Sequence, residues 1–115
     1  METLIDKIVA NPKLHSKWLN SLSMMENVGA KKIKNCEDPV FVSEMILKHA
    51  SEEARHAYFL KKQIVKIEEN ACPTYEKQYL IRHRSFYFYS EIQFPPNWNG
   101  CIFFLLPFLS ILWLN

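Results

Sequence analysis

The sequence predicts an all-α fold in which two helices pair antiparallel as a hairpin and a third helix follows. Two glycines in 115 residues, 14% aromatic residues and the usage of Lys, Glu, Leu and Ile favour helices over a turn-rich β structure or a disordered chain. Apolar residues recur at helical spacing along residues 12–34 and 39–69. A chain of this length forms one domain with a small core, so we expect a partner or a ligand to add stability.

The first expected helix spans residues 12–34. Asn11 and Pro12 mark its start, because proline suits the first helical position. Glu26 shares one side of this helix with a set of apolar or small residues, namely Leu19, Leu22, Gly29, Ala30 and Ile33. Glu26 therefore lies in the middle of the stripe that is expected to face the core.

The second expected helix spans residues 39–69, with Asp38 as its N-cap and Pro39 in the first helical position. The link between the two helices is short, so they should pack antiparallel. At 3.6 residues per turn, one set of residues falls within roughly 40–60° around this helix. The set is Val42, Ile46, His49, Glu53, His56, Leu60, Ile64 and Ile67. A glutamate and two histidines thus interrupt a stripe that is otherwise apolar.

The rest of the chain is less regular. A third helix is expected at residues 75–92, although the aromatic run at 86–89 suits a strand equally. Residues 12–94 would form the helical domain, and residues 95–115 a proline-broken apolar tail. The apolar run at 101–114 is shorter than the ~18–20 residues of a transmembrane helix, so no transmembrane segment is predicted. The tail could dock on the core, bind a partner or be the remnant of a disrupted reading frame.

Charge and cysteine usage narrow the classes of function. Fourteen basic and twelve acidic residues give a net charge of +2 without a dense basic run, so nucleic acid is not an expected partner. Cys36, Cys72 and Cys101 are odd in number and form no close pair. With no secretory signal at the N-terminus, this predicts a cytoplasmic protein without a cysteine-based metal site.

The polar residues in the two stripes indicate chemistry at the helix interface. Burying an ionised carboxylate without a partner costs several kcal/mol, so Glu26 and Glu53 need a cation, a proton or a metal ion. No inward-facing lysine or arginine accompanies them in the pattern. Glu53 and His56 lie three residues apart on one helix face and can aim at a single point, which Glu26 can reach from the antiparallel neighbour. The alternative is a local Glu53–His56 pair, with Glu26 bonded to His56 or to a hydroxyl of the second helix.

These residues resemble the first half of the ferritin-like di-metal carboxylate family. The resemblance rests on Glu26 in LSMMENVGAKKI and on the Glu-x-x-His motif EARH at 53–56, and it covers residues 14–67. It implies half of a four-helix bundle, in which two helices each give one Glu and the other two each give a Glu-x-x-His. No second Glu-x-x-His follows Ile67. Glu91 is the remaining candidate for a ligand on the third helix, and the chain resembles a family member cut short.

The resemblance implies a metal site and an oxidoreductase. Glu26 and Glu53 together balance one divalent cation, and His56 adds a neutral ligand. Oxygen and nitrogen ligands without thiolates suit iron or manganese, and zinc also binds such groups. Because one chain supplies half of a di-metal site, we expect a homodimer to supply the other half across a two-fold axis. The family chemistry is oxygen or peroxide activation; the small-molecule substrate stays open, because one bundle serves several reactions.

Two other functions fit parts of the sequence. The missing second half and the tail fit a truncated, non-catalytic helical interaction module without a metal pair. A mononuclear zinc hydrolase would use His49, Glu53 and His56, but zinc-protease helices place two histidines four residues apart, and here they are seven apart. Within the ferritin-like interpretation, His49 is a further candidate ligand or a hydrogen-bond donor to one.

Overall fold

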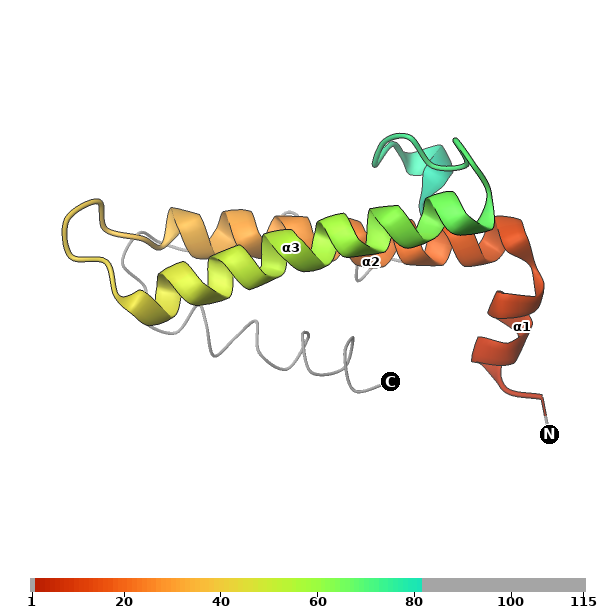
Figure 1. Cartoon of the computed structure of the whole chain (residues 1–115), viewed down its shortest axis with the longest axis horizontal. Helices are drawn as coiled ribbons and strands as arrows, with labels where there is room; N and C mark the ends of the chain where they lie inside the picture. The colour runs from red at the N-terminus through yellow and green to blue at the C-terminus, as the bar shows by residue number, and fades with distance from the viewer. Residues whose placement is uncertain (1, 82–115) are drawn as a thin grey trace.

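Two long antiparallel helices make up most of the described part of the chain, which is residues 2–81 of the computed structural model. Helix α2, Pro12–Asn35, packs along helix α3, Glu44–Ile67, as a hairpin (Figure 1). Helix α1, Leu4–Ala10, bends away at the start of α2. After α3, residues 68–81 fold back over the same half of the hairpin; we call them the returning segment, and they contain the 3-10 helix η1, Lys77–Tyr79. The predicted all-α class and the antiparallel hairpin are confirmed.

Hydrogen-bonding caps set the start of α1 and α2. Thr3 and Asp6 form a capping box, in which the Thr3 amide donates to Oδ2 of Asp6 at 3.0 Å and the Asp6 amide donates to Oγ1 of Thr3 at 3.1 Å. The sequence patterning did not predict α1, although the Thr-x-x-Asp spacing is a signal for it. Asn11 caps α2 through Oδ1, which accepts from the Leu14 amide at 3.2 Å, and Pro12 follows in the first helical position as predicted.

Helix α3 begins at Glu44, so the expected start at Pro39 is wrong. Oδ1 of Asp38 accepts hydrogen bonds from the amides of Val40 and Phe41, at 2.8 and 2.7 Å, which closes a turn inside the connection. The helix cap is Ser43, whose Oγ accepts from the Ile46 amide at 3.2 Å. An aspartate followed by a proline can start either a turn or a helix, and here the side chain stabilises the turn.

The chain after α3 differs from the helix expected at residues 75–92. Helix α3 ends at Ile67, and Asn70 takes a left-handed conformation with φ of 62°, which asparagine tolerates better than most residues. Within residues 75–81 the regular structure is the short η1. The remainder of the expected helix, the tail at 95–115 and Glu91 lie outside the described residues.

One hydrophobic cluster of the core lies between α2 and α3 beside the returning segment. Its buried members are Leu19, Leu22, Leu60, Ile64 and Cys72, and the residues packed against them are Trp18, Ile67, Ala71 and Tyr79. The other half of the hairpin also has buried apolar residues, among them Ala30, Ile33 and Ala50. Each fully buried leucine or isoleucine side chain contributes about 1.5–3 kcal/mol to stability. Across residues 2–81, no helix combines the length and the apolar character that crossing a bilayer requires.

Candidate metal centre

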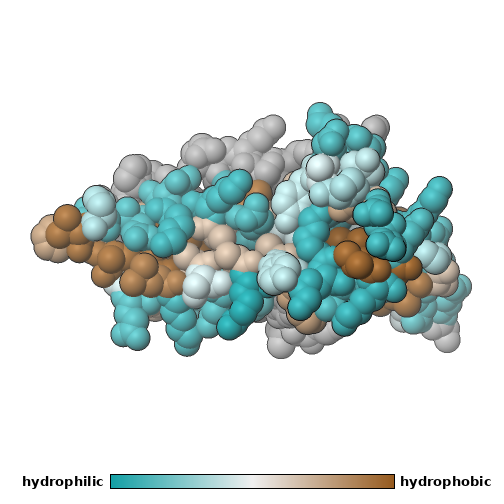
Figure 2. Space-filling view, turned by 45° about the horizontal axis from the view of Figure 1, so that its top comes forward, coloured by the Kyte–Doolittle hydropathy of each residue, from teal (hydrophilic) through white to brown (hydrophobic). Residues whose placement is uncertain are grey.

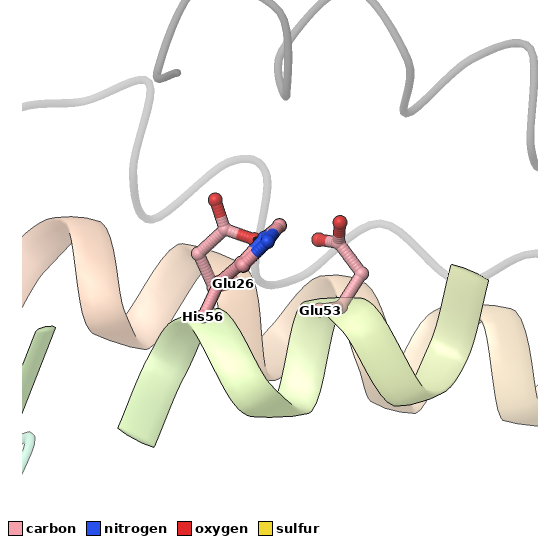
Figure 3. Close-up of side chains that lie close together, drawn as sticks. All are labelled: Glu26, Glu53 and His56. Atoms are coloured by element: carbon pink, nitrogen blue, oxygen red, sulfur yellow. Dashed lines mark ion pairs between the residues drawn. The ribbon is translucent and has the colours of Figure 1, made fainter. Parts of the chain in front are cut away.

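Glu26 from α2 and Glu53 and His56 from α3 meet at the helix interface. Each of the three offers one ligand atom such that all these atoms lie within 4.8 Å of one another. Nδ1 of His56 is 3.5 Å from Oε2 of Glu26. Figure 3 shows the three side chains extending to the same side of the hairpin, Glu26 from one helix and the other two from its neighbour. The predicted convergence of these residues is therefore present, and the cluster could bind a metal.

Small buried residues flank the cluster on both helices. Gly29 and Ala30 on α2 are buried, as are Ala50 and Ala57 on α3. Small side chains at these positions shorten the distance between helix axes, so short acidic side chains from both helices can reach one another. On α3, Glu53 and His56 are separated by less than one turn, which puts both on the same face.

Burial separates the cluster from water. Glu26 is 0% exposed, Glu53 is 2% exposed, and the His56 side chain is 29% exposed. The exposed part of the His56 ring lies away from Nδ1, because Nδ1 itself is buried. The groups that face one another in the cluster are therefore all shielded from solvent.

The carboxyl group of Glu53 has a strongly raised pKa. Burial, followed by hydrogen bonding with Glu26 and the charges of Glu26 and Glu52, raises the pKa of Glu53 from 4.5 to about 9. All of these effects favour the protonated carboxyl. At neutral pH the metal-free cluster therefore holds a proton that a divalent cation can displace, since metals bind the deprotonated carboxylate.

The donor set fits a metal ion. Two ligands bound to one ion at about 2.1 Å lie roughly 3.0–3.4 Å apart for octahedral or tetrahedral angles. The 3.5 Å between His56 and Glu26 is already close to that separation, and Glu53 completes the set with a small side-chain movement. Oε2 of Glu53 is buried, and no amide, hydroxyl or ammonium group in the described part of the chain donates to it. The hydrogen bond that Glu53 shares with Glu26 is one that a cation between the two carboxyl groups would replace.

The other predicted site residues lie elsewhere. His49 is on the same stripe of α3, but its Nδ1 faces Oε2 of Glu52 at 3.8 Å, and it is not a member of the cluster that residues 2–81 form. Glu52 also lies 4.0 Å from Nζ of Lys48, so its carboxylate belongs to the half-exposed outer side of the helix. The zinc hydrolase alternative, which needs His49 with Glu53 and His56, is not supported by this arrangement. Glu91 lies outside the described residues.

A polar network beside the cluster was not foreseen from the sequence. Asn20 donates through Nδ2 to the carbonyl oxygens of Thr74 and Tyr79, at 2.9 and 3.1 Å, and its Oδ1 accepts from Nζ of Lys61. Nζ of Lys61 also donates to the carbonyl oxygen of Cys72 at 2.9 Å. Burial lowers the pKa of Lys61, so these acceptors compensate for the lost hydration of its ammonium group. The network holds the segment after α3 against both helices.

Comparisons of the chain with protein-family models, with curated protein sequences and with solved structures give no match in any of the three.

Proposed function

We propose that this protein is a ferritin-like metal-binding protein that acts as an oxidoreductase, activating oxygen or peroxide at a di-metal site completed by dimerisation. The observation that carries the proposal is the buried convergence of Glu26, Glu53 and His56. Two carboxylates and an imidazole without a thiolate suit iron or manganese, and zinc is a further candidate. When bound, a redox-active ion would supply electron transfer to oxygen or peroxide.

The protein's own residues have distinct parts in this proposal. Glu26 and Glu53 neutralise the charge of one divalent cation, and the imidazole of His56 provides a neutral third ligand. Because Glu26 and Glu53 are buried, little water surrounds the cluster, and this strengthens its electrostatic attraction for a cation. Glu53 takes up a proton when the cation leaves, in keeping with its raised pKa.

Dimerisation is part of the proposal because the cluster of the described residues is half of a di-metal ligand set. Two copies related by a two-fold axis would bring together four carboxyl groups and two imidazoles, enough for two ions. The size of the metal-loaded protein, measured by light scattering during gel filtration, tests this part. We expect a dimer, and a protein that stays monomeric with iron or manganese bound would contradict it.

Metal analysis of loaded variants tests the site itself. The protein is incubated with Mn(II), or with Fe(II) under argon, desalted, and its metal content measured by inductively coupled plasma mass spectrometry. We expect about one ion per chain in the wild type, and a loss of about tenfold or more in affinity for Glu53→Gln and His56→Ala, because each removes one ligand of three. Oxygen uptake after Fe(II) addition should fall in the same variants.

His49→Ala is the matched control for this experiment, because His49 lies on the same stripe of α3 yet contacts Glu52 outside the cluster. Its metal content should equal that of the wild type. A wild-type protein that binds no metal, or metal retained in Glu53→Gln and His56→Ala, would contradict the proposal.

A non-catalytic helical interaction module is the second candidate function, and exposed apolar residues favour it. Val40 and Phe41, in the connection between α2 and α3, are 75% and 88% exposed. Figure 2 shows hydrophobic side chains gathered at this end of the hairpin. An exposed apolar patch is typical of a protein contact site. Metal-free protein whose stability is unchanged by divalent ions would favour this function over the first.

A further inference from the structure

Ser23 lies inside the hairpin between a backbone carbonyl of α3 and a tyrosine from the returning segment. Its Oγ is 2.7 Å from the carbonyl oxygen of Ala57 and 2.7 Å from the hydroxyl of Tyr75. Ser23 is 0% exposed, so water does not compete for either bond. These three residues, Tyr75, Ser23 and Ala57, form what we call the hydroxyl bridge.

The direction of each hydrogen bond in the hydroxyl bridge follows from counting protons. A serine hydroxyl has one proton, and Ser23 donates it to the carbonyl oxygen of Ala57, which can only accept. The hydroxyl of Tyr75 must therefore donate to Oγ of Ser23. Burial raises the pKa of Tyr75, so its phenol keeps the proton that this bond needs.

The hydroxyl bridge is next to the metal cluster on both helices. Ser23 precedes Glu26 by three residues on α2, about 4.5 Å along the helix axis, and Ala57 directly follows His56 on α3. The side chain of Ala57 is only a methyl group, so it offers little surface against which side chains of α2 can pack beside Ser23. At this level a directional hydrogen bond to the carbonyl oxygen of Ala57 therefore adds to the resistance that the apolar packing farther along the hairpin gives to sliding of α2 along α3.

A metal site is sensitive to such sliding. Ligand atoms must lie within about 0.2 Å of their ideal distance from the ion, whereas apolar side chains accommodate larger shifts. Movement of α2 along α3 carries Glu26 relative to Glu53 and His56, because the first is on one helix and the other two on its neighbour. The axial register of the two helices therefore determines whether the three ligand atoms can share one ion.

We propose that Tyr75 and Ser23 are positioning residues for the metal site: their hydroxyl bridge to Ala57 fixes the register of α2 on α3 and so aligns Glu26 with Glu53 and His56. This inference rests on the proposed function, since it assigns a role toward the bound cation. Neither hydroxyl is a ligand. Both act through the backbone that carries the ligands.

Titration of Mn(II) into the full-length protein, followed by electron paramagnetic resonance of the free ion, tests the inference. Tyr75→Phe removes the phenol hydroxyl that donates to Ser23. Ser23→Ala removes the hydroxyl that donates to the carbonyl oxygen of Ala57 and so joins the two helices. We expect Mn(II) affinity to fall about tenfold in Ser23→Ala and less in Tyr75→Phe. Affinities are measured well below the unfolding temperature of each variant, where a role in stability alone leaves the affinity of the folded protein unchanged. Ser23→Thr keeps a hydroxyl and should restore most of the affinity.

Ser21→Ala is the matched control. Ser21 is as buried as Ser23, and its Oγ accepts from the amide of Ile81 at 2.9 Å, so it also joins α2 to the returning segment. Its other bond goes to the carbonyl oxygen of Lys17 on its own helix, and it makes no bridge to α3. Mn(II) affinity should be the same in Ser21→Ala as in the wild type.

The outcomes separate the two proposals. Wild-type binding with undiminished affinity in both Tyr75→Phe and Ser23→Ala overturns the positioning role and leaves the metal site standing. An equal loss in Ser21→Ala also overturns it, because the effect is then general to the returning segment. If Ser23→Ala does not fold, Tyr75→Phe decides, since it preserves the ring against the Lys61 ammonium at 4.5 Å. A wild-type protein without Mn(II) affinity overturns the proposed function, and the positioning role fails with it.

Discussion

A carboxyl group buried beside a second carboxyl group holds its proton more tightly than one in water. Glu53 is in this situation, with Glu26 within the cluster and Glu52 adjacent on α3, and its pKa rises to about 9. A cation placed between the carboxyl groups reverses the balance, because it attracts both charges and removes their repulsion. The same burial that makes Glu53 a weak acid in the metal-free protein therefore makes it a strong ligand.

The raised pKa of Glu53 predicts how the stability of the metal-free protein depends on pH. The folded state keeps the proton up to about pH 9, whereas the unfolded chain releases it near 4.5. The stabilising contribution is full below pH 4.5 and is lost as pH rises toward 9, because the unfolded state binds fewer protons over that interval. Glu53→Gln cannot titrate, so its stability should not show this decline.

Urea denaturation of both proteins in EDTA, between about pH 5 and pH 9, measures the difference. We expect the free energy of unfolding of the wild type to fall relative to Glu53→Gln as pH increases. Parallel curves for the two proteins would contradict the raised pKa. The comparison with Glu53→Gln cancels the contributions of titrating groups away from the cluster, so the difference reports on the Glu26–Glu53 pair.

Helical periodicity predicted that Glu26, Glu53 and His56 meet between the two helices, because it fixes the face on which each residue lies. It could not exclude His49, which is on the same face of α3. Seven residues separate His49 from His56, about 10.5 Å along the axis, so a shared face is not a shared point. Tyr75 was also beyond such reasoning, because its contact with α2 depends on the path of the chain after α3.

At the scale of elements, the start of a helix was predictable where the capping residues favour a helix over a turn. Asn11 followed by Pro12 gave the start of α2. Asp38 followed by Pro39 could start either a helix or a turn, and in the structure the Asp38 side chain stabilises a turn. Ser43, five residues later, caps α3 in its place. Oδ1 of Asp38 is used by the amides of Val40 and Phe41, so the N-terminus of α3 is capped by the next suitable side chain along the sequence.

The cap at Ser43 predicts a measurable contribution to stability. Ser43→Ala removes the acceptor for the Ile46 amide, which should lower the free energy of unfolding by about 1 kcal/mol. Ser51→Ala is the control, since Ser51 is exposed and bonds only the carbonyl oxygen of Lys48 within α3; its effect should stay within about 0.5 kcal/mol. Urea denaturation monitored by circular dichroism measures both. An equal effect of the two substitutions would contradict the assignment of Ser43 as the cap.

At the scale of the whole molecule, the hairpin and its acidic interface were predictable from two stripes and a short connection. The returning segment was not, because its contacts come from buried polar groups that carry no periodic signal. Asn20, Ser21 and Ser23 on α2 all bond to it or to α3. Ser21 and Ser23 lie about 160° apart around α2, yet both are buried, as is Asn20, so the buried surface of α2 is wider than the apolar stripe from which the sequence was interpreted.

Anomalous diffraction from crystals of the manganese-loaded protein tests the central claim most directly. Data collected above and below the manganese absorption edge locate the ion without assumptions about its ligands. We predict an anomalous peak between Glu26, Glu53 and His56, about 2.0–2.3 Å from one atom of each. Crystals in which manganese binds only elsewhere, with the carboxyl groups of Glu26 and Glu53 bonded to each other, would contradict the account.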